Sequence, residues 1–251
     1  MIVVRWEGRL AEAATSLERL LLPNSCIACD RLVESRTPDG LVCSVCRARL
    51  ETAQVGCDRC GQPLPPVGPC RFCTGWPTAL RRARSAVWLG PEAREIVHRL
   101  KYDDCTILAE LAAETIARRV RHPGPALLLP VPLGLKRREA RGYNQAAYIA
   151  HALGRRWDLG SDERLLRRVR DTASQTALTP EARLANVAGA FAAERGNASG
   201  PVAAILIDDV LTTGATLCAA AEALAAAGWA DVTAITFARA LPFEIRALAD
   251  R

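Results

Sequence analysis

The sequence predicts an α/β protein in which a mostly parallel sheet, flanked by helices, follows a small cysteine-rich domain. Three observations lead to this fold class. Strand-like apolar runs alternate with helical patterns from residue 83 onward. Four Cys-x2-Cys pairs crowd into residues 26–73. One apolar run, residues 202–207, ends in two adjacent carboxylates and a loop of threonines and one glycine. The 251 residues, 50% of them hydrophobic, suffice for one large domain and a small one.

The chain begins with a stretch that has helical spacing. In residues 9–22 apolar side chains recur every three or four positions, and Pro23 and Asn24 end the pattern just before the first cysteine. We expect this helix to pack on the rest of the protein. The predicted division of the chain is an N-terminal amphipathic helix, a cysteine-rich domain, a linker and a sheet domain, at residues 1–22, 23–75, 76–82 and 83–251.

The paired cysteines have the spacing of zinc ligands. Two thiolates separated by two residues can turn onto one tetrahedral Zn²⁺, and two such pairs complete four ligands. All eight positions are cysteine, so no place is left for water and we predict two structural zinc ions. Sequential pairing of the knuckles and cross-braced pairing both fit the spacing. The predicted ligands are Cys26, Cys29, Cys43, Cys46, Cys57, Cys60, Cys70 and Cys73.

Other readings of the knuckles explain less of the pattern. A thioredoxin-like redox role suits one Cys-x2-Cys pair but does not account for four, and iron–sulfur ligation is a further alternative. Residues 23–75 are poor in large apolar groups. We therefore expect metal binding to replace a hydrophobic core in this segment.

Strands and helices then alternate to the end of the chain. Strands are predicted at residues 85–89, 126–131, 165–169, 202–207 and 232–237. Helices are predicted at 91–102, 105–120, 180–186 and 215–227, and a further helix ends near residue 157 after the basic stretch 136–145. Ligands of parallel sheets bind at the carboxyl ends of strands. Two strands end in candidate sites, residues 130–133 and the carboxylates at 208 and 209.

The carboxylate pair and its loop suit a phosphorylated sugar. Backbone N–H groups, threonine hydroxyls and a helix N-terminus can surround a phosphate, and a glycine lets the backbone approach it. Carboxylates repel phosphate, but they accept hydrogen bonds from a vicinal diol. The glycine patterns of P-loop ATPases and of dinucleotide sites are absent. An ordinary strand–turn–helix corner is the alternative, although two charges at the end of a buried strand need a reason.

The net charge of +6 is concentrated in residues 117–170, where Lys and Arg far outnumber Asp and Glu. This surplus fits a polyanionic ligand such as pyrophosphate, a nucleotide or a nucleic acid, or else a solvated arginine-rich surface. No apolar run approaches the length of a membrane span, and the N-terminus lacks the pattern of an export signal. We therefore predict a cytoplasmic protein.

Residues 205–216 resemble the phosphoribosyl-pyrophosphate (PRPP) loop of type I phosphoribosyltransferases. Together with the knuckles they make the chain similar to the ComF family (competence protein F, or GntX type), which joins a double zinc ribbon to a type I phosphoribosyltransferase domain. The resemblance covers nearly the whole chain. It extends to Leu100-Lys101-Tyr102, Pro130-Val-Pro-Leu, Arg138-x2-Arg141-Gly-Tyr-Asn-Gln-Ala146 and Arg170-x-Thr172-x2-Gln175-x2-Leu178-x4-Arg183-x2-Asn186-x4-Phe191.

The resemblance implies roles for these residues. The candidate catalytic residues, Asp208 and Asp209, would bind the ribose hydroxyls directly or through Mg²⁺. The 5′-phosphate would be held by Thr212, Thr213, Gly214, Ala215 and Thr216. The loop after Val131 would bind the pyrophosphate, with Leu133, Arg137, Arg138 and Arg141 as the candidate residues. Residues 171–179, with Thr172 and Gln175, would form the mobile loop that closes over PRPP. Glutamine amidotransfer is excluded, because the first cysteine, Cys26, lies in a knuckle rather than at the N-terminus.

Two classes of function follow from the resemblance, which also implies a link to DNA uptake in natural transformation. The first is a Mg²⁺-dependent phosphoribosyltransferase, a glycosyltransferase whose acceptor no motif identifies. The second is a non-catalytic protein that senses PRPP or binds single-stranded DNA, with other competence proteins as further partners. Aromatic residues make up 5% of the chain, and the candidate base-stacking residues are Trp76, Tyr102 and Tyr143.

Overall fold

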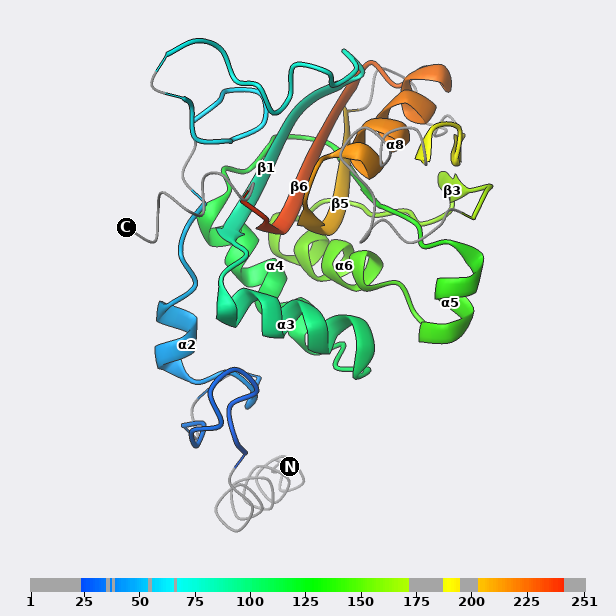
Figure 1. The fold of residues 1–251 in the computed structure, drawn as a ribbon. Helices are drawn as coiled ribbons and strands as arrows, with labels where there is room; N and C mark the ends of the chain where they lie inside the picture. The colour runs from blue at the N-terminus through cyan, green and yellow to red at the C-terminus, as the bar shows by residue number, and fades with distance from the viewer. Residues whose placement is uncertain are drawn as a thin grey trace, which may run out of the picture.

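The computed structural model describes residues 24–34, 37, 39–53, 56–65, 67–171, 187–194 and 203–241. The predicted N-terminal helix at 1–22, the mobile-loop candidates Thr172 and Gln175 and the predicted helix at 180–186 lie outside the described residues. The described residues form a sheet with helices around it and two cysteine-rich segments (Figure 1). No helix in these ranges is both long enough and apolar enough to span a bilayer.

The central sheet is parallel throughout its four strands. These are β1 (Leu80–Trp88), β2 (Leu127–Pro130), β5 (Ala203–Leu211) and β6 (Asp231–Arg239), in the order β1-β6-β5-β2. A second, antiparallel sheet pairs β3 (Leu166–Arg168) with β4 (Phe191–Ala193). The mostly parallel α/β fold is therefore confirmed.

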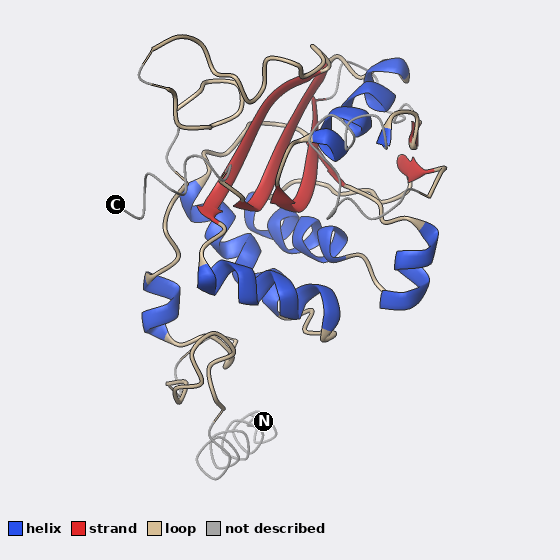
Figure 2. Cartoon of the chain, in the orientation of Figure 1, coloured by secondary structure: helices blue, strands red, loops and turns tan. Residues whose placement is uncertain are grey.

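Helices cover both faces of the central sheet (Figure 2). α4 (Leu108–Arg119) and α6 (Gln145–Trp157) pack on one face, with α3 (Pro91–Tyr102) against α4, and α8 (Ala215–Ala226) packs on the other. The shorter helices are α2 (Ser44–Ala48) and α5 (Leu135–Arg141). Local sequence starts two of the helices: Pro91 occupies the first turn of α3, and the Asn144 side chain accepts the Ala146 N–H at the start of α6.

The central strand β5 divides the core into two layers. Ile205 and Ile207 point into a cluster with α3, α4 and α6, whereas Ala204 and Leu206 point into a cluster with α8. All four are at most 1% exposed. A strand buried on both faces reads as a nearly continuous apolar run, which is why residues 202–207 identified it. This burial holds the carboxyl end of β5 in place.

Strands β1, β5 and β6 are all longer than predicted. β1 begins at Leu80, inside the predicted linker, because Leu80 is fully buried and pairs with Val232 although two arginines follow it. β5 does not end at residue 207 but runs through the carboxylate pair to Leu211, which pairs with Arg239 on β6. The acidic side chains therefore lie on strand backbone, which is more rigid than a loop.

The basic stretch after residue 131 was wrongly predicted to be a loop. Residues 135–141 form helix α5, which projects from the sheet (Figure 1). None of its side chains is buried. Good helix formers fill it, and Gly142, at φ +79°, ends it in a left-handed conformation. Arg137, Arg138 and Arg141 thus stand on a helix.

Candidate functional site

The eight knuckle cysteines form two separate clusters of four. Cys26, Cys29, Cys43 and Cys46 make one, and Cys57, Cys60, Cys70 and Cys73 make the other; within each, the four sulfur atoms lie within 4.8 Å of one another. The pairing is therefore sequential, and the cross-braced alternative is wrong. We call these clusters, with the turns around them, the first and second zinc ribbon.

The sulfur–sulfur distances match tetrahedral zinc. Zn–S bonds of about 2.3 Å place tetrahedral ligands about 3.8 Å apart. The Sγ atoms of Cys29 and Cys43 are 3.8 Å apart, those of Cys57 and Cys73 are 3.7 Å apart, and those of Cys60 and Cys70 are 3.6 Å apart. Each cluster therefore fits one structural Zn²⁺ ion.

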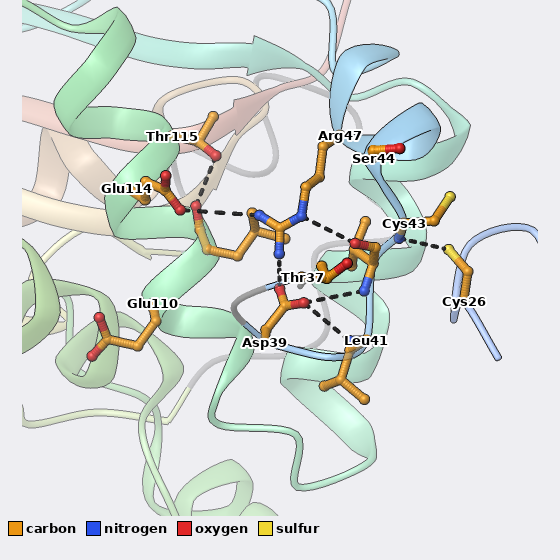
Figure 3. Close-up of polar contacts among 12 residues, drawn as sticks. Cys26, Thr37, Asp39, Leu41, Cys43, Ser44, Arg47, Glu110, Glu114 and Thr115 are labelled. Carbon is orange, nitrogen blue, oxygen red and sulfur yellow. Dashed lines mark hydrogen bonds and ion pairs between the residues drawn. The ribbon is translucent and has the colours of Figure 1, made fainter. Parts of the chain in front are cut away.

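The first zinc ribbon packs on the α3 and α4 face of the sheet. Its buried cysteines belong to the same hydrophobic cluster as Ile96 and Ile116. Arg47 of α2 forms an ion pair with Asp39 within the ribbon and reaches Glu114 of α4 at 4.0 Å (Figure 3). The expectation that metal replaces a core is only partly right, because this ribbon also shares the core of the sheet domain.

The second zinc ribbon packs on the opposite, α8 face. Its Arg59 donates hydrogen bonds to the carbonyls of Cys73, Trp76, Pro77 and Leu80 at 2.7–3.2 Å. Arg239, at the end of β6, is 1% exposed; its guanidinium donates to Gln62 Oε1 at 2.7 Å and to the Cys60 carbonyl, and lies 4.5 Å from the centre of the Phe72 ring. The ribbon is thus bonded to the carboxyl end of the sheet.

A cavity of about 630 Å³ lies at this end of the sheet. Seven of the sequence-predicted site residues line it: Leu133, Arg137, Arg141, Asp208, Asp209, Thr212 and Thr216. Arg138, Thr213, Gly214 and Ala215 are not among the lining residues. Thr213 Oγ1 instead accepts the Ala215 N–H at 3.4 Å, within the turn that starts α8. The cavity therefore joins β5, its threonine loop and α5 in one site.

A lysine that sequence analysis left without a role enters this cavity. Lys101 Nζ lies 2.5 Å from Asp209 Oδ2, and the Asp209 side chain is almost fully buried. Sequence did hold a signal for it: Lys101 follows Leu100 and is four residues after Val97, so a cation stands beside the apolar face of α3. Arg168 of β3 also lines the cavity and was likewise missed.

The surroundings of the two carboxyl groups shift their pKa values in opposite directions. Burial, together with the charge of Asp209 beside it, raises the pKa of Asp208 well above its ordinary value. Burial acts in the same direction on Asp209, but the Lys101 ammonium outweighs it and lowers the pKa of Asp209. The Asp208 carboxylate accepts the Asp209 N–H at 2.8 Å. Of the two, Asp209 therefore ionises first, paired with Lys101, and Asp208 loses its proton at higher pH.

The three candidate stacking residues differ in exposure. Trp76 is 6% exposed, so it cannot stack on a base and this prediction is wrong. Tyr143 is partly buried, and its hydroxyl donates to the Leu100 carbonyl at 2.6 Å. Tyr102 is 67% exposed, with the Arg141 guanidinium 5.2 Å from its ring centre. Of the three, Tyr102 alone presents an accessible ring.

Comparisons with known proteins agree with this organisation. The model of the double zinc ribbon domain family matches residues 17–74, which include all eight knuckle cysteines. The chain is 32% identical to the DNA utilization protein YhgH of Salmonella typhimurium over 215 residues, covering 80% of this chain and 91% of that protein. It is 31% identical to the competence protein ComFC of Bacillus subtilis over 249 residues, covering 91% and 98%. Competence protein F of Haemophilus influenzae is 33% identical over 117 residues, 46% of this chain and 51% of that protein.

Proposed function

The chain belongs to the ComF family, and from that premise we propose that it binds PRPP with Mg²⁺ in the cavity at Asp208 and Asp209 and serves DNA uptake. The observation that carries the proposal is the convergence of three chemistries in one cavity. An acidic pair, a threonine loop at a helix N-terminus and arginines from α5 all line it. Its volume of about 630 Å³ lies in the usual range of ligand pockets.

Each part of PRPP has a counterpart in the cavity. Thr212 and Thr216, with the N-terminus of the 12-residue α8, would hold the 5′-phosphate. The carboxylates of Asp208 and Asp209 would accept the ribose hydroxyls. Arg137 and Arg141 would bind the pyrophosphate. The two carboxylates are also the hard oxygen ligands that Mg²⁺ prefers, and the bound ion would neutralise charge on the departing pyrophosphate.

The same site suits phosphoribosyl transfer. Release of pyrophosphate from C1 leaves positive charge on the ribose ring, and nearby carboxylates stabilise that charge. No nucleophilic side chain is needed, because the acceptor itself attacks C1. A phosphoribosyltransferase is therefore the activity that this chemistry favours, with an acceptor that the cavity does not identify.

A second candidate function is single-stranded DNA binding by the same fold without turnover. The names of the relatives, a DNA utilization protein and two competence proteins, favour it. So does helix α5, whose cations Lys136, Arg137 and Arg138 are all exposed and whose Arg141 guanidinium lies 5.2 Å from the centre of the accessible Tyr102 ring. Cations that track a backbone beside an aromatic ring form the usual single-strand site.

Calorimetric titration with PRPP tests the proposal. We expect saturable binding with Mg²⁺ and much weaker binding without it, and no heat of binding under either condition would refute the proposal. Pyrophosphate release, measured with a panel of bases and oligonucleotides, separates the two functions. Acceptor-dependent release supports the transferase. Salt-sensitive oligonucleotide binding with no release supports the binding protein.

The raised pKa of Asp208 predicts that PRPP binding strengthens as pH rises. Mg²⁺ binding needs the ionised carboxylate, and protonated Asp208 must first lose its proton. Affinity should therefore fall as pH falls through the pKa of Asp208, by up to about tenfold per pH unit for one proton. Titrations in buffers of different ionisation enthalpy should show proton release on binding.

Ribose 5-phosphate without Mg²⁺ is the matched control. Its phosphate titrates in the same pH range as the 5′-phosphate of PRPP, but it brings no metal ion to Asp208. A pH dependence that is equal for both ligands would assign the effect to the phosphate and contradict the prediction.

A further inference from the structure

Trp76, the residue that follows the second zinc ribbon, lies against the loop of residues 212–216. Its indole Nε1–H donates a hydrogen bond to the Thr213 carbonyl at 3.2 Å. A Cβ atom at Gly214 would lie 2.5–2.9 Å from the Cζ2, Cε2 and Nε1 atoms of the indole. Glycine is needed at position 214 for two reasons: a side chain would clash with the indole, and the backbone φ of +83° favours glycine. The indole therefore packs directly on the backbone of the loop.

The zinc ribbon itself holds the indole in place. The Trp76 backbone N–H donates to the carbonyl of Cys73, a predicted zinc ligand, at 3.1 Å. Arg59 donates to both the Cys73 and the Trp76 carbonyl at 3.2 Å. Phe72, the neighbour of Cys73, meets the indole edge to face with ring centres 5.7 Å apart. The position of Trp76 thus depends on the backbone that carries Cys73.

The hydrogen bond from the Trp76 indole to the Thr213 carbonyl also orients the loop of residues 212–216. A trans peptide is planar, and its C=O and N–H point in opposite directions. Because Trp76 draws the Thr213 carbonyl toward the ribbon, the Gly214 N–H of the same peptide points away from the ribbon. Gly214 is the N-cap of α8, so the same contact sets where that helix begins. Thr212 and Thr216, on either side, line the cavity.

We propose that Trp76 is a positioning residue for the loop, through which zinc in the second ribbon and ligand in the cavity stabilise each other. The ligand part rests on the proposed binding of PRPP. Coupling between two sites is reciprocal, so an intact second ribbon raises PRPP affinity and bound PRPP slows zinc loss from that ribbon. The first ribbon, on the opposite face of the sheet, takes no part.

Trp76→Phe removes the indole bond and keeps an aromatic ring. Trp229→Phe is the matched control: Trp229 is 7% exposed, against 6% for Trp76, and its indole donates to the Glu194 carbonyl at 3.0 Å, away from the loop. With both variants holding two zinc ions, we expect PRPP affinity to fall about tenfold in Trp76→Phe and to stay within about twofold of wild type in Trp229→Phe. Equal affinities in the two variants would overturn the proposal.

Hydrogen–deuterium exchange tests the positioning step without PRPP. We expect the amides of residues 212–216 to exchange faster in Trp76→Phe than in wild type or Trp229→Phe, with exchange in α4 unchanged. Unchanged loop exchange would overturn the proposal even if PRPP binds. Faster loop exchange in Trp76→Phe, together with a wild-type protein that fails to bind PRPP, would refute the proposed function alone.

Zinc release to a chromophoric chelator tests reciprocity. We expect Mg²⁺-PRPP to slow the release of one zinc ion per chain in wild type and in Trp229→Phe. The release of the other ion should not change. Loss of this protection in Trp76→Phe supports the coupling, and full protection in Trp76→Phe contradicts it.

Discussion

Asp208→Asn is expected to weaken PRPP binding by roughly 100-fold and to leave the fold intact. The substitution keeps the size and shape of the side chain. It removes one of two carboxylates that would bind Mg²⁺ and the ribose hydroxyls, and hydrogen bonds to charged groups contribute about 1.5–3 kcal/mol each. Because about 1.4 kcal/mol is a tenfold change in affinity, two such bonds reach the predicted loss. Calorimetric titration with Mg²⁺-PRPP measures it, and an affinity equal to that of wild type would show that Asp208 does not contact the ligand.

Asp209→Asn should weaken PRPP binding at least as much as Asp208→Asn. A second variant is needed to separate lost binding from lost stability. Lys101 would lose its ion pair, and breaking a buried pair by removing one member typically costs about 3–5 kcal/mol of stability. Asp209→Asn/Lys101→Met removes both charges and should recover most of the lost stability. If the double variant is stable and still fails to bind PRPP, the loss belongs to the carboxylate rather than to unfolding. Recovered binding would instead assign the carboxylate a structural role.

The parts of the site that could be predicted from the sequence are those whose residues lie next to one another in the chain. The acidic pair and its threonine loop are contiguous, and the knuckle spacing is local, so both could be identified from order alone. Sequential pairing of the knuckles could not, because it depends on which sulfur atoms the folded ribbon brings together. The contact between Asp209 and Lys101 joins residues that are far apart in the chain, and it forms only because folding brings the end of α3 to the end of β5.

The predictions that failed for single elements and residues have identifiable physical causes. The resemblance implied a pyrophosphate-binding loop after Val131, although residues 135–141 are good helix formers with a glycine directly after them. Strand β4 has three residues, too few for a periodic pattern, and its pairing with β3 is set by tertiary structure. Trp76 was named as a candidate for base stacking, yet only the folded ribbon shows that its indole covers Gly214.

Loss of either zinc ion is expected to lower the thermal midpoint by more than about 10 °C. Cys46→Ser removes a ligand of the first ribbon and Cys60→Ser one of the second, and each variant should retain one zinc ion per chain. Zinc contributes about 10–16 kcal/mol to the folding of small finger domains. In a protein of this size each kcal/mol shifts the midpoint by about 2–4 °C, so even a fraction of that energy reaches the predicted change.

The effect should spread beyond the ribbons because the ligands belong to the cores of the sheet. Cys46 is fully buried in the cluster of α3 and α4, and Cys60 is fully buried in that of α8. Cys60→Ser has a further consequence: Arg239 donates to the Cys60 carbonyl and Gln62, so disorder of the second ribbon leaves a buried guanidinium without these partners. We therefore expect Cys60→Ser to be the less stable of the two variants.

Cys105→Ser is the control, because Cys105 is partly exposed and lies outside both clusters. It should keep two zinc ions and change stability by no more than about 0.5 kcal/mol. Elemental analysis and scanning calorimetry of the three variants make the comparison. A midpoint for Cys60→Ser equal to that of Cys105→Ser would show that the second ribbon folds independently of the sheet, and the coupling between ribbon and loop would then lack its structural basis.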